Sequence, residues 1–500
     1  MPFIIESDTL PLLSSPIKDA AAVRREEHHA ADVVIVGAGI LGSAIASALA
    51  RQGRSVILLE KSLKQPDRIV GELLQPGGVQ ALEELGLRDC LEEIDAIPVY
   101  GYEVSYHNSP VHIPYPVNGA KDGKRPEGRS FHHGRFVQKL RMAAMQEKNV
   151  MVVETKATEL IRNQYTGQVL GVKCITKEEP DYYFGALTIV SDGYGSGFRK
   201  EFSSVAPVVK SKFYGLELID AKLPRPGHGH VILSKNAPVL LYQIGTRETR
   251  ILVDIPEGTP SASHANGGAK GHLAKVVLPT LPEGARESFS DALENGKLRS
   301  MPNSWLPPTT NRTPGVTLLG DALNMRHPLT GGGMTAALND VVLIRRLLSP
   351  ATVPDLTDTK SVLKQLKRFH WQRKSLTSVI NILAQALYSL FAANGEFISM
   401  RLDFTDYRVD YQLQALQLGC FRYFQLGGNC VDGPVGLLAG IIRRPFVLFY
   451  HFFAVALYGM WIFAAQSPLW KLPMTLVECA MIFWKACVVI FPFIFSELKS

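Results

Sequence analysis

The chain has 500 residues, 46% of them hydrophobic, and its 53 basic and 46 acidic side chains give a formal net charge of +7. This length suits two or three domains with large cores. The charge is mild, and no dense stripe of Lys and Arg interleaves with aromatic residues, so composition gives no case for a nucleic-acid partner. The 6 cysteines form no C-x-x-C pair, which argues against a zinc site or a disulfide framework.

The first regular structure is predicted to follow a flexible N-terminal segment, residues 1–30. Residues 32–36 are an apolar, β-branched run typical of a buried strand, and a second such run over residues 55–59 ends at Glu60. Between them, a glycine turn leads into apolar residues at helical spacing. A G-x-G-x-x-G turn in this context, with an acid about 20 residues later, predicts dinucleotide binding.

The glycine turn has a direct physical reading as a phosphate site. Glycines let the backbone approach a pyrophosphate closely, and the helix that begins there directs unpaired N–H groups at it. The expected contacts come from Gly37, Gly39, Ile40, Leu41 and Gly42. Glu60 would accept hydrogen bonds from a ribose, with Lys61 beside it. NAD would satisfy this turn as well as FAD, and a purely structural βαβ unit is the alternative.

The middle of the chain changes character. Strand-like runs at residues 231–233, 239–244 and 250–255 are separated by Pro, Gly and charged residues. They predict an antiparallel sheet domain over residues 206–300, inserted into a nucleotide-binding domain made of residues 31–205 and 301–350. Residues 256–272, rich in Gly, Pro, Ser and Ala, are predicted to be a surface loop.

A second cofactor element is predicted after residues 316–319, which again read as a strand. Asp321 would lie at the carboxyl end of that strand, where its carboxylate can hold a ribityl hydroxyl. Three glycines then open a helix that begins near Met334, which is expected to lie against the cofactor. A helix N-terminus facing a flavin ring stabilises negative charge on the reduced flavin. This element favours FAD over a nicotinamide cofactor, with a helix cap and a flexible loop as the alternative.

Residues 351–500 are predicted to be a helical, membrane-associating region. Residues 445–465 are almost wholly apolar and long enough to span a bilayer. A second apolar stretch, residues 472–495, contains Glu478, Lys485 and Pro492, so a clean second span is not expected. Three arrangements stay open: a single span, a helical hairpin dipping into one leaflet, which is favoured, and a buried helix pair.

Several long motifs carry a family resemblance. They are DRIVGELLQPGG at 67–78, GRSFHHGRF at 128–136, SDGYGSGFRK at 191–200, MPNSWLPP at 301–308 and GDALNMRHPLTGGGMT at 320–335. Through them the chain resembles the squalene monooxygenase (squalene epoxidase) family, in its fungal form. The resemblance implies an α/β fold: an FAD-binding Rossmann-like domain of the flavin monooxygenase type, an inserted antiparallel β substrate domain and a C-terminal helical membrane region.

The same resemblance implies the reaction and its setting. Squalene would be epoxidised to 2,3-oxidosqualene in sterol (ergosterol) synthesis, by O2 activated as a flavin hydroperoxide. An alkene attacks that group directly, so no catalytic side chain is expected; the protein would exclude water and place the double bond. NADPH would supply electrons through a membrane-bound NADPH–cytochrome reductase. The expected location is the endoplasmic reticulum (microsomal) membrane, in contact with lipid, with the catalytic domain facing the cytosol.

Further site residues follow only from the family pattern. Near FAD it implies four: Arg68, Leu73, Arg141 and Ala157. Near the substrate channel it implies Gln75 and Tyr102, and a buried Tyr102 hydroxyl would need a partner that the Gln75 amide could supply. Ordinary structural roles are the alternatives: Arg141 as a solvated helix charge, Leu73 as core and Tyr102 as strand packing. No metal site is expected, because adjacent histidines such as His132 and His133 point apart.

Two other functions fit parts of the pattern. The glycine turn and the Gly-Asp pair also suit other flavin enzymes of this fold, such as a ubiquinone hydroxylase or an isoprenoid reductase. A prenyl-protein escort would keep the glycine fold without flavin. The long strings around Asp321 and residues 71–78 favour the epoxidase, and the apolar C-terminal region agrees.

Overall fold

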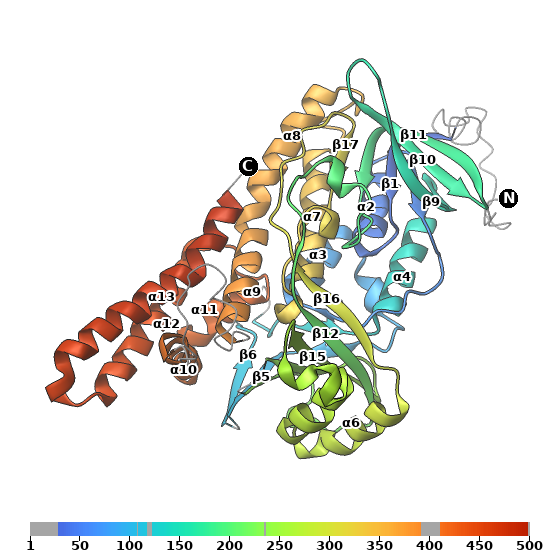
Figure 1. Ribbon diagram of the computed structural model, residues 1–500. Helices are drawn as coiled ribbons and strands as arrows, with labels where there is room; N and C mark the ends of the chain where they lie inside the picture. The colour runs from blue at the N-terminus through green and yellow to red at the C-terminus, as the bar shows by residue number, and fades with distance from the viewer. Residues whose placement is uncertain (1–28, 108, 118–122, 235–236, 392–410, 499–500) are drawn as a thin grey trace.

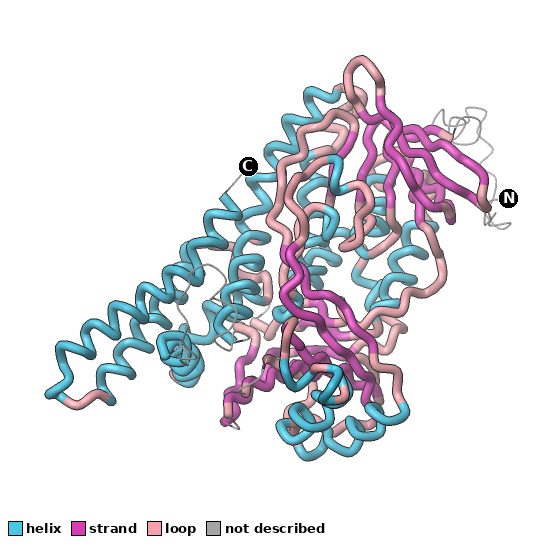
Figure 2. Tube along the Cα trace, viewed as in Figure 1, coloured by secondary structure: helices cyan, strands magenta, loops and turns pink. Residues whose placement is uncertain are grey.

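The computed structural model describes the whole chain except residues 1–28, 108, 118–122, 235–236, 392–410 and 499–500. The predicted N-terminal segment, residues 1–30, therefore lies almost wholly outside the described residues. The rest forms two large sheets, one above the other in Figure 1, and a set of C-terminal helices along one side. Figure 2 shows how the strands gather in these two places while helix dominates the C-terminal third.

The first sheet contains the predicted nucleotide-binding strands. Its strand order is β8-β2-β1-β11-β10-β9, with β17 paired to β11. The bounds are β1 Ala30–Val36, β2 Val56–Glu60, β8 Val150–Glu154, β9 Lys156–Arg162, β10 Val169–Thr176, β11 Glu179–Val190 and β17 Val316–Leu318. Pairs among β8, β2, β1, β11 and β17 are parallel. The β-branched, fully buried centre of β1 suits a parallel strand covered on both faces.

Helices pack against this sheet and share its core. They are α2 Ile40–Ala50, α3 Pro76–Leu85, α4 His133–Met145, α7 Gly333–Leu347 and α8 Thr359–Gln372. The helix α2 follows the glycine turn and is built of Ala, Ser, Gly, Ile and Leu, which lets it pack closely; nearly all of it is buried. The predicted strand–turn–helix–strand unit and the predicted strand and helix around Asp321 are confirmed.

The second sheet contains strands from outside residues 206–300, the segment predicted to form it. Its order is β16-β12-β15-β14-β13-β5-β6. The bounds are β5 Gly101–Tyr106, β6 Ser109–Pro114, β12 Val208–Ile219, β13 Gly229–Leu233, β14 Val239–Gln243, β15 Glu248–Pro256 and β16 Arg299–Trp305. The β5–β6 hairpin joins the sheet through a parallel pairing of β5 with β13. That pairing links strands more than a hundred positions apart, so residues 206–300 alone do not delimit this sheet.

Two smaller units complete this half of the molecule. A three-stranded sheet contains β3 Leu73–Leu74, β7 Gly128–Ser130 and β4 Ile97–Val99. The outer face of the second sheet is covered by α6 Glu283–Asn295 (Figure 1), and α5 spans Gly268–His272. The prediction of a plain surface loop over residues 256–272 is wrong in part, because α5 and two short 3₁₀ turns occupy it. Leu273 and Phe289 bury this segment against the sheet.

The C-terminal region is helical, as predicted. Its helices are α9 Thr377–Phe391, α10 Tyr411–Gln425, α11 Asn429–Leu438, α12 Pro445–Gln466 and α13 Leu472–Leu498. The last two form an antiparallel pair that projects from the body at the lower left of Figure 1. The mean hydropathy is 1.8 for α12 and 2.0 for α13. In the most apolar part of each helix, only 22% of the residues of α12 and 28% of those of α13 are buried.

The second apolar stretch forms one helix in spite of Glu478, Lys485 and Pro492. The helix α13 is continuous over 27 residues, and by length and composition it could cross a membrane as well as α12 could. Glu478 and Lys485 are partly buried rather than exposed, and Glu478 accepts a hydrogen bond from Gln412 of α10 at 3.5 Å. Both charged side chains are thus partly covered, and Glu478 has a polar partner on α10.

Candidate active site

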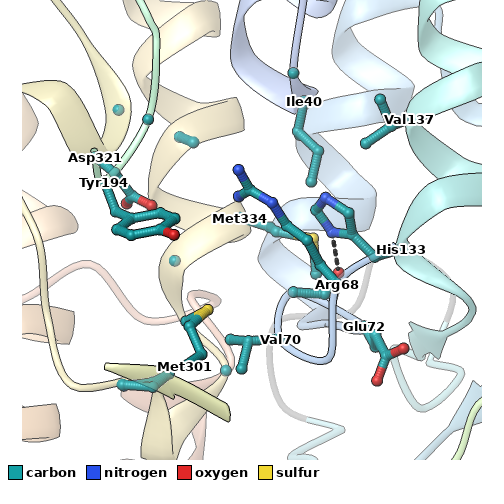
Figure 3. A pocket seen from close by; sticks show the side chains of 18 of the residues that line it. Ile40, Arg68, Val70, Glu72, His133, Val137, Tyr194, Met301, Asp321 and Met334 are labelled. Atoms are coloured by element: carbon teal, nitrogen blue, oxygen red, sulfur yellow. Dashed lines mark hydrogen bonds between the residues drawn. The ribbon is translucent and has the colours of Figure 1, made fainter. Parts of the chain in front are cut away.

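A long cavity lies between the glycine turn and the second sheet. At one end it is bounded by Gly37, Gly39, Glu60 and Lys61; at the other it reaches the apolar side chains of the second sheet. Figure 3 shows its middle, where Arg68 points between Asp321 and Tyr194 on one side and Ile40 and His133 on the other. The cavity brings together most of the predicted site residues: Gly37, Gly39, Ile40, Leu41, Glu60, Lys61, Arg68, Leu73, Tyr102, Arg141, Asp321 and Met334.

The glycine turn closes the nucleotide end, and each glycine has a different reason to be there. Gly37 has φ +99°, and a Cβ on it would lie 2.6 Å from the carbonyl oxygen of Ser191. A Cβ on Gly42 would collide with the carbonyl of Gly37, whereas one on Gly39 would meet nothing within 4 Å. Gly39 therefore leaves space for a ligand, and Gly42, which does not line the cavity, lets the helix pack against the turn. The first turn of α2 has no side-chain cap and no acid, so its N–H groups face the cavity ready for an anion.

Glu60 and Arg141 fix the backbone of this turn by hydrogen bonds to Ala38. The Glu60 carboxylate accepts a hydrogen bond from the Ala38 N–H at 2.8 Å and lies 3.5 Å from Nη2 of Arg141. Arg141 donates from Nε to the Ala38 carbonyl at 2.8 Å and from Nη1 to the Lys64 carbonyl at 3.1 Å. Burial lowers the pKa of Arg141, and Glu60 opposes that shift. Arg141 is thus a buried brace of the cofactor turn and not a solvated helix charge.

A second clamp fixes the loop that carries Asp321. Arg199 donates from Nε to the carbonyl of Ala322 at 3.0 Å and from Nη2 to the carbonyl of Asp321 at 2.9 Å. The same Nη2 also reaches the carbonyls of Gly193 and Tyr194, at 3.1 and 3.0 Å. Arg199 therefore joins the Asp-Gly turn after β11 to the Gly-Asp turn after β17. The Asp321 side chain stays exposed toward the cavity, where it can accept hydrogen bonds.

The loop over residues 68–73 forms one wall and is tied down from two sides. Gly71, with φ +84°, accepts a hydrogen bond on its carbonyl from His133 Nδ1 at 3.0 Å (Figure 3). Burial lowers the pKa of His133 to about 4, so its ring is neutral at ordinary pH. Glu72 is 1% exposed and makes a two-point ion pair with Arg250 of β15, at 2.7 and 2.9 Å. Burial raises the pKa of Glu72, and Arg250 opposes that shift.

The far end of the cavity is apolar and carries one polar cluster. Its apolar lining from the second sheet and nearby segments comprises Val70, Val231, Leu240, Leu252 and Met301. The Gln75 amide donates to the Tyr102 hydroxyl and to the Thr330 carbonyl, and accepts from the Tyr115 hydroxyl at 2.7 Å. Burial raises the pKa of Tyr102 to about 12. The expected Gln75–Tyr102 pair is confirmed; Gln75 itself is fully buried behind the cavity wall.

One expected site residue lies outside the cavity, and one residue of the site was not expected. Ala157 does not line the cavity; it lies in β9, paired with Cys174 of β10, on the antiparallel part of the first sheet. One residue separates β9 from β8, and β9 pairs with β10 whereas β8 pairs with β2. The sequence also gave no reason to single out Arg250, because only the tertiary fold brings it to Glu72. Glu72 lies within the 67–78 motif, and this was the one sequence feature that pointed to its importance.

Comparisons with known proteins agree with this geometry. The family model "FAD dependent oxidoreductase" matches residues 32–66. A probable FAD-dependent monooxygenase from Pseudomonas aeruginosa superposes with TM-score 0.61 at 20% identity, covering 73% of this chain and 97% of its own. A p-nitrophenol 4-monooxygenase from Pseudomonas putida gives TM-score 0.63 at 16% identity, covering 83% and 98%. The fold is that of FAD-dependent monooxygenases.

Sequence comparison is more specific. The family model "Squalene epoxidase" matches residues 184–477. Squalene epoxidase erg1 of Aspergillus fumigatus is 63% identical over 484 residues, 97% of this chain and 97% of its own. Squalene monooxygenase of Mus musculus is 44% identical over 473 residues, 94% of this chain and 78% of its own. The chain belongs to the squalene epoxidase family.

The residues present fit an FAD. The open space above Gly39 and the uncapped start of α2 suit a pyrophosphate, and Glu60 suits a ribose. The start of α7, with Gly332 at its cap position and no side-chain cap, faces the same cavity beside Met334. Several buried oxygen atoms of the described residues have no hydrogen-bond partner. One of them, Asp192 Oδ1, belongs to a residue that lines this cavity. When bound, FAD supplies the electron transfer and oxygen activation that side chains lack.

Proposed function

We propose that the chain epoxidises squalene to 2,3-oxidosqualene, using O2 and NADPH-derived electrons. The single observation that carries the proposal is the shape of the cavity, which runs from a phosphate-binding turn to an apolar wall without interruption. A hydrocarbon with no polar group needs such a wall, because only shape and burial can hold it. Family membership supports squalene as that hydrocarbon.

In this proposal the protein binds FAD, orients the alkene and excludes water from the site. The glycine turn, Glu60, Lys61 and Arg141 hold the nucleotide half of FAD, while Arg68, Asp321 and Met334 lie along the half that reacts. Leu73 and the apolar wall exclude water from the reacting alkene. The buried Gln75 amide fixes the Tyr102 hydroxyl, so the substrate meets a rigid phenol ring there. No side chain has to act as a nucleophile.

The setting is part of the proposal. The helices α12 and α13 present apolar side chains such as Trp461, Phe446 and Trp484 to the outside, which supports contact with membrane lipid. We infer an endoplasmic reticulum membrane with the catalytic body in the cytosol, and electron delivery by an NADPH–cytochrome reductase, as the family resemblance implies. The net charge of +7 suits an anionic lipid surface.

Reconstitution tests the proposal. We expect detergent-purified protein to be yellow, and to convert squalene to 2,3-oxidosqualene when NADPH, O2 and a cytochrome reductase are supplied, with the product identified by mass spectrometry. Omitting the reductase should abolish turnover. Colourless protein would contradict flavin binding, whereas yellow protein that consumes NADPH without forming epoxide would contradict the substrate.

A further inference from the structure

A buried cation in the cavity wall, Arg326, forms no direct ion pair with a carboxylate among the described residues. Arg326 is 8% exposed and lines the cavity. Its Nη2 donates to the backbone and side-chain oxygens of Asn324, at 3.2 and 2.8 Å, and its Nη1 reaches the Gly333 carbonyl at 3.5 Å. Within the described residues its Nε has no partner. A buried charge is costly unless an opposite charge lies close by, so the counter-charge has to be found further out.

Two amide side chains lead from Arg326 to a carboxylate. The Asn324 oxygen that accepts from Arg326 also accepts from Asn381 Nδ2 of α9 at 3.0 Å. The same Nδ2 donates to Oε1 of Glu497 at 2.7 Å, and the Ser378 hydroxyl donates to Oε2 of Glu497 at 2.6 Å. Glu497 is only 2% exposed, although it stands in the last turn of the apolar helix α13.

The other charged groups near Arg326 differ from Glu497 in partner or in exposure. Asp340 and Arg373 form a closed two-point pair, at 3.0 and 2.7 Å, with both side chains buried. Asp321 is exposed toward the cavity, where a cofactor can use it. Lys374 donates to the backbone carbonyl of Glu497 at 2.6 Å, which favours the end of α13 but leaves its carboxylate to Ser378 and Asn381. Asp321 and Asp340 also attract Arg326 through space, but Glu497 is the buried carboxylate that hydrogen bonds connect to it, through Asn381 and Asn324.

We propose that Glu497 is a positioning residue of the cofactor cavity. Through Asn381 and Asn324 its carboxylate serves as the counter-charge of Arg326 and fixes the loop that leads to the start of α7. The end of the apolar C-terminal hairpin is thereby built into the cofactor site. The inference rests on flavin occupying the cavity, as in the proposed function, but not on squalene being the substrate.

A charge-only substitution separates this role from packing. In Glu497→Gln the amide oxygen can still accept from Asn381, and the Ser378 hydroxyl can turn to accept from the new N–H, so the hydrogen bonds survive while the charge is lost. Arg326 is then uncompensated and should favour the reduced, more negative cofactor. We expect the flavin midpoint potential of full-length, detergent-purified protein to become more positive. Glu497→Ala should in addition weaken FAD binding roughly ten-fold, because buried donors are left unpaired.

Two controls make the result decisive. Glu478→Gln removes a carboxylate from the same helix, far along it from Glu497, and should change neither potential nor affinity. In an Arg326→Met background, Glu497→Gln should shift the potential clearly less, because the part of the effect that acts through Arg326 is gone. A Glu497→Gln protein with the wild-type potential, or an equal shift in both backgrounds, overturns the proposal. Wild-type protein that binds no flavin would overturn this inference and the proposed function together, whereas flavin-loaded protein that forms no epoxide refutes only the proposed substrate.

Discussion

The nucleotide end of the cavity is built mainly from one continuous segment, residues 30–61, in which the strand, turn, helix and acid follow one another, with Arg141 as its distant brace. The opposite end is assembled from distant parts of the chain: Glu72 meets Arg250 across 178 positions, and Gln75 meets Thr330 across 255. The first end depends on backbone geometry and open space. The second depends on buried polar side chains that must all be satisfied at once, so a single deletion there leaves an unpaired group inside the protein.

The largest expected effect falls on the assembled end. Arg250→Ala leaves the buried Glu72 carboxylate without its ion-pair partner, which should lower the free energy of unfolding by about 3–5 kcal/mol. Urea unfolding of the detergent-purified protein measures this. Glu72→Gln combined with Arg250→Met removes both charges and should recover much of the loss. If the double variant is no more stable than Arg250→Ala, an uncompensated charge is not the cause.

Lowering the pH should reduce the free energy of unfolding through His133, which holds the same end of the cavity. Its folded-state pKa of about 4 lies below the ordinary 6.5, so between these values the unfolded chain binds the proton more readily. Stability from this group is complete above pH 6.5 and is lost as the pH falls toward 4, amounting to roughly 3 kcal/mol below that pH. His133→Gln can still donate to the Gly71 carbonyl. Its free energy of unfolding should therefore fall less steeply between pH 7 and pH 4 than that of the wild type, and parallel profiles would contradict this.

The flavin-facing turn should respond through binding and not through stability. Asp321→Ala removes an exposed carboxylate whose expected partner is a ribityl hydroxyl, a charge-assisted hydrogen bond worth roughly 1.5–3 kcal/mol. FAD should bind tens-fold more weakly, as measured by fluorescence during reconstitution of the flavin-free protein. Asp321→Asn keeps an acceptor and should lose less. Full flavin retention by the alanine variant after dilution would remove Asp321 from the cofactor site.

The glycine turn allows a matched pair of substitutions at the nucleotide end. Gly42→Ala places a methyl group against the Gly37 carbonyl and should lower the free energy of unfolding by about 1–3 kcal/mol. Gly39→Ala places its methyl group in open space, so the flavin-free protein should stay as stable as wild type while FAD binds less tightly. Thermal unfolding without flavin and FAD titration distinguish the two. Equal destabilisation by both would show that the space above Gly39 is not kept for a ligand.

The contrast between the two ends also explains what could be read from the sequence. The local unit up to Glu60 was predicted, because each residue acts on neighbours within its own strand–turn–helix. Arg250 was missed, and Ala157 lies outside the cavity lining, since sheet pairing decides where those side chains lie. The β5–β6 hairpin likewise joined the second sheet by a parallel pairing that leaves no local pattern. Gln75 and Tyr102 were predicted only from the family resemblance, because their contacts are tertiary and leave no local pattern in the sequence.

The smallest expected effect is also the most specific to the substrate end. Tyr102→Phe removes one hydroxyl and leaves one N–H of the buried Gln75 amide without its acceptor, a cost of about 1–3 kcal/mol confined to the cavity wall. The amide keeps its bonds to Thr330 and Tyr115, so the wall should loosen without collapsing. FAD content should stay normal, while the ratio of epoxide formed to NADPH consumed falls. A Tyr115→Phe variant, which removes the hydroxyl that donates to the same amide from behind the wall, should lower this ratio less. An unchanged ratio and rate in Tyr102→Phe would separate this residue from substrate placement, and a colourless Tyr102→Phe protein would place it against the flavin instead.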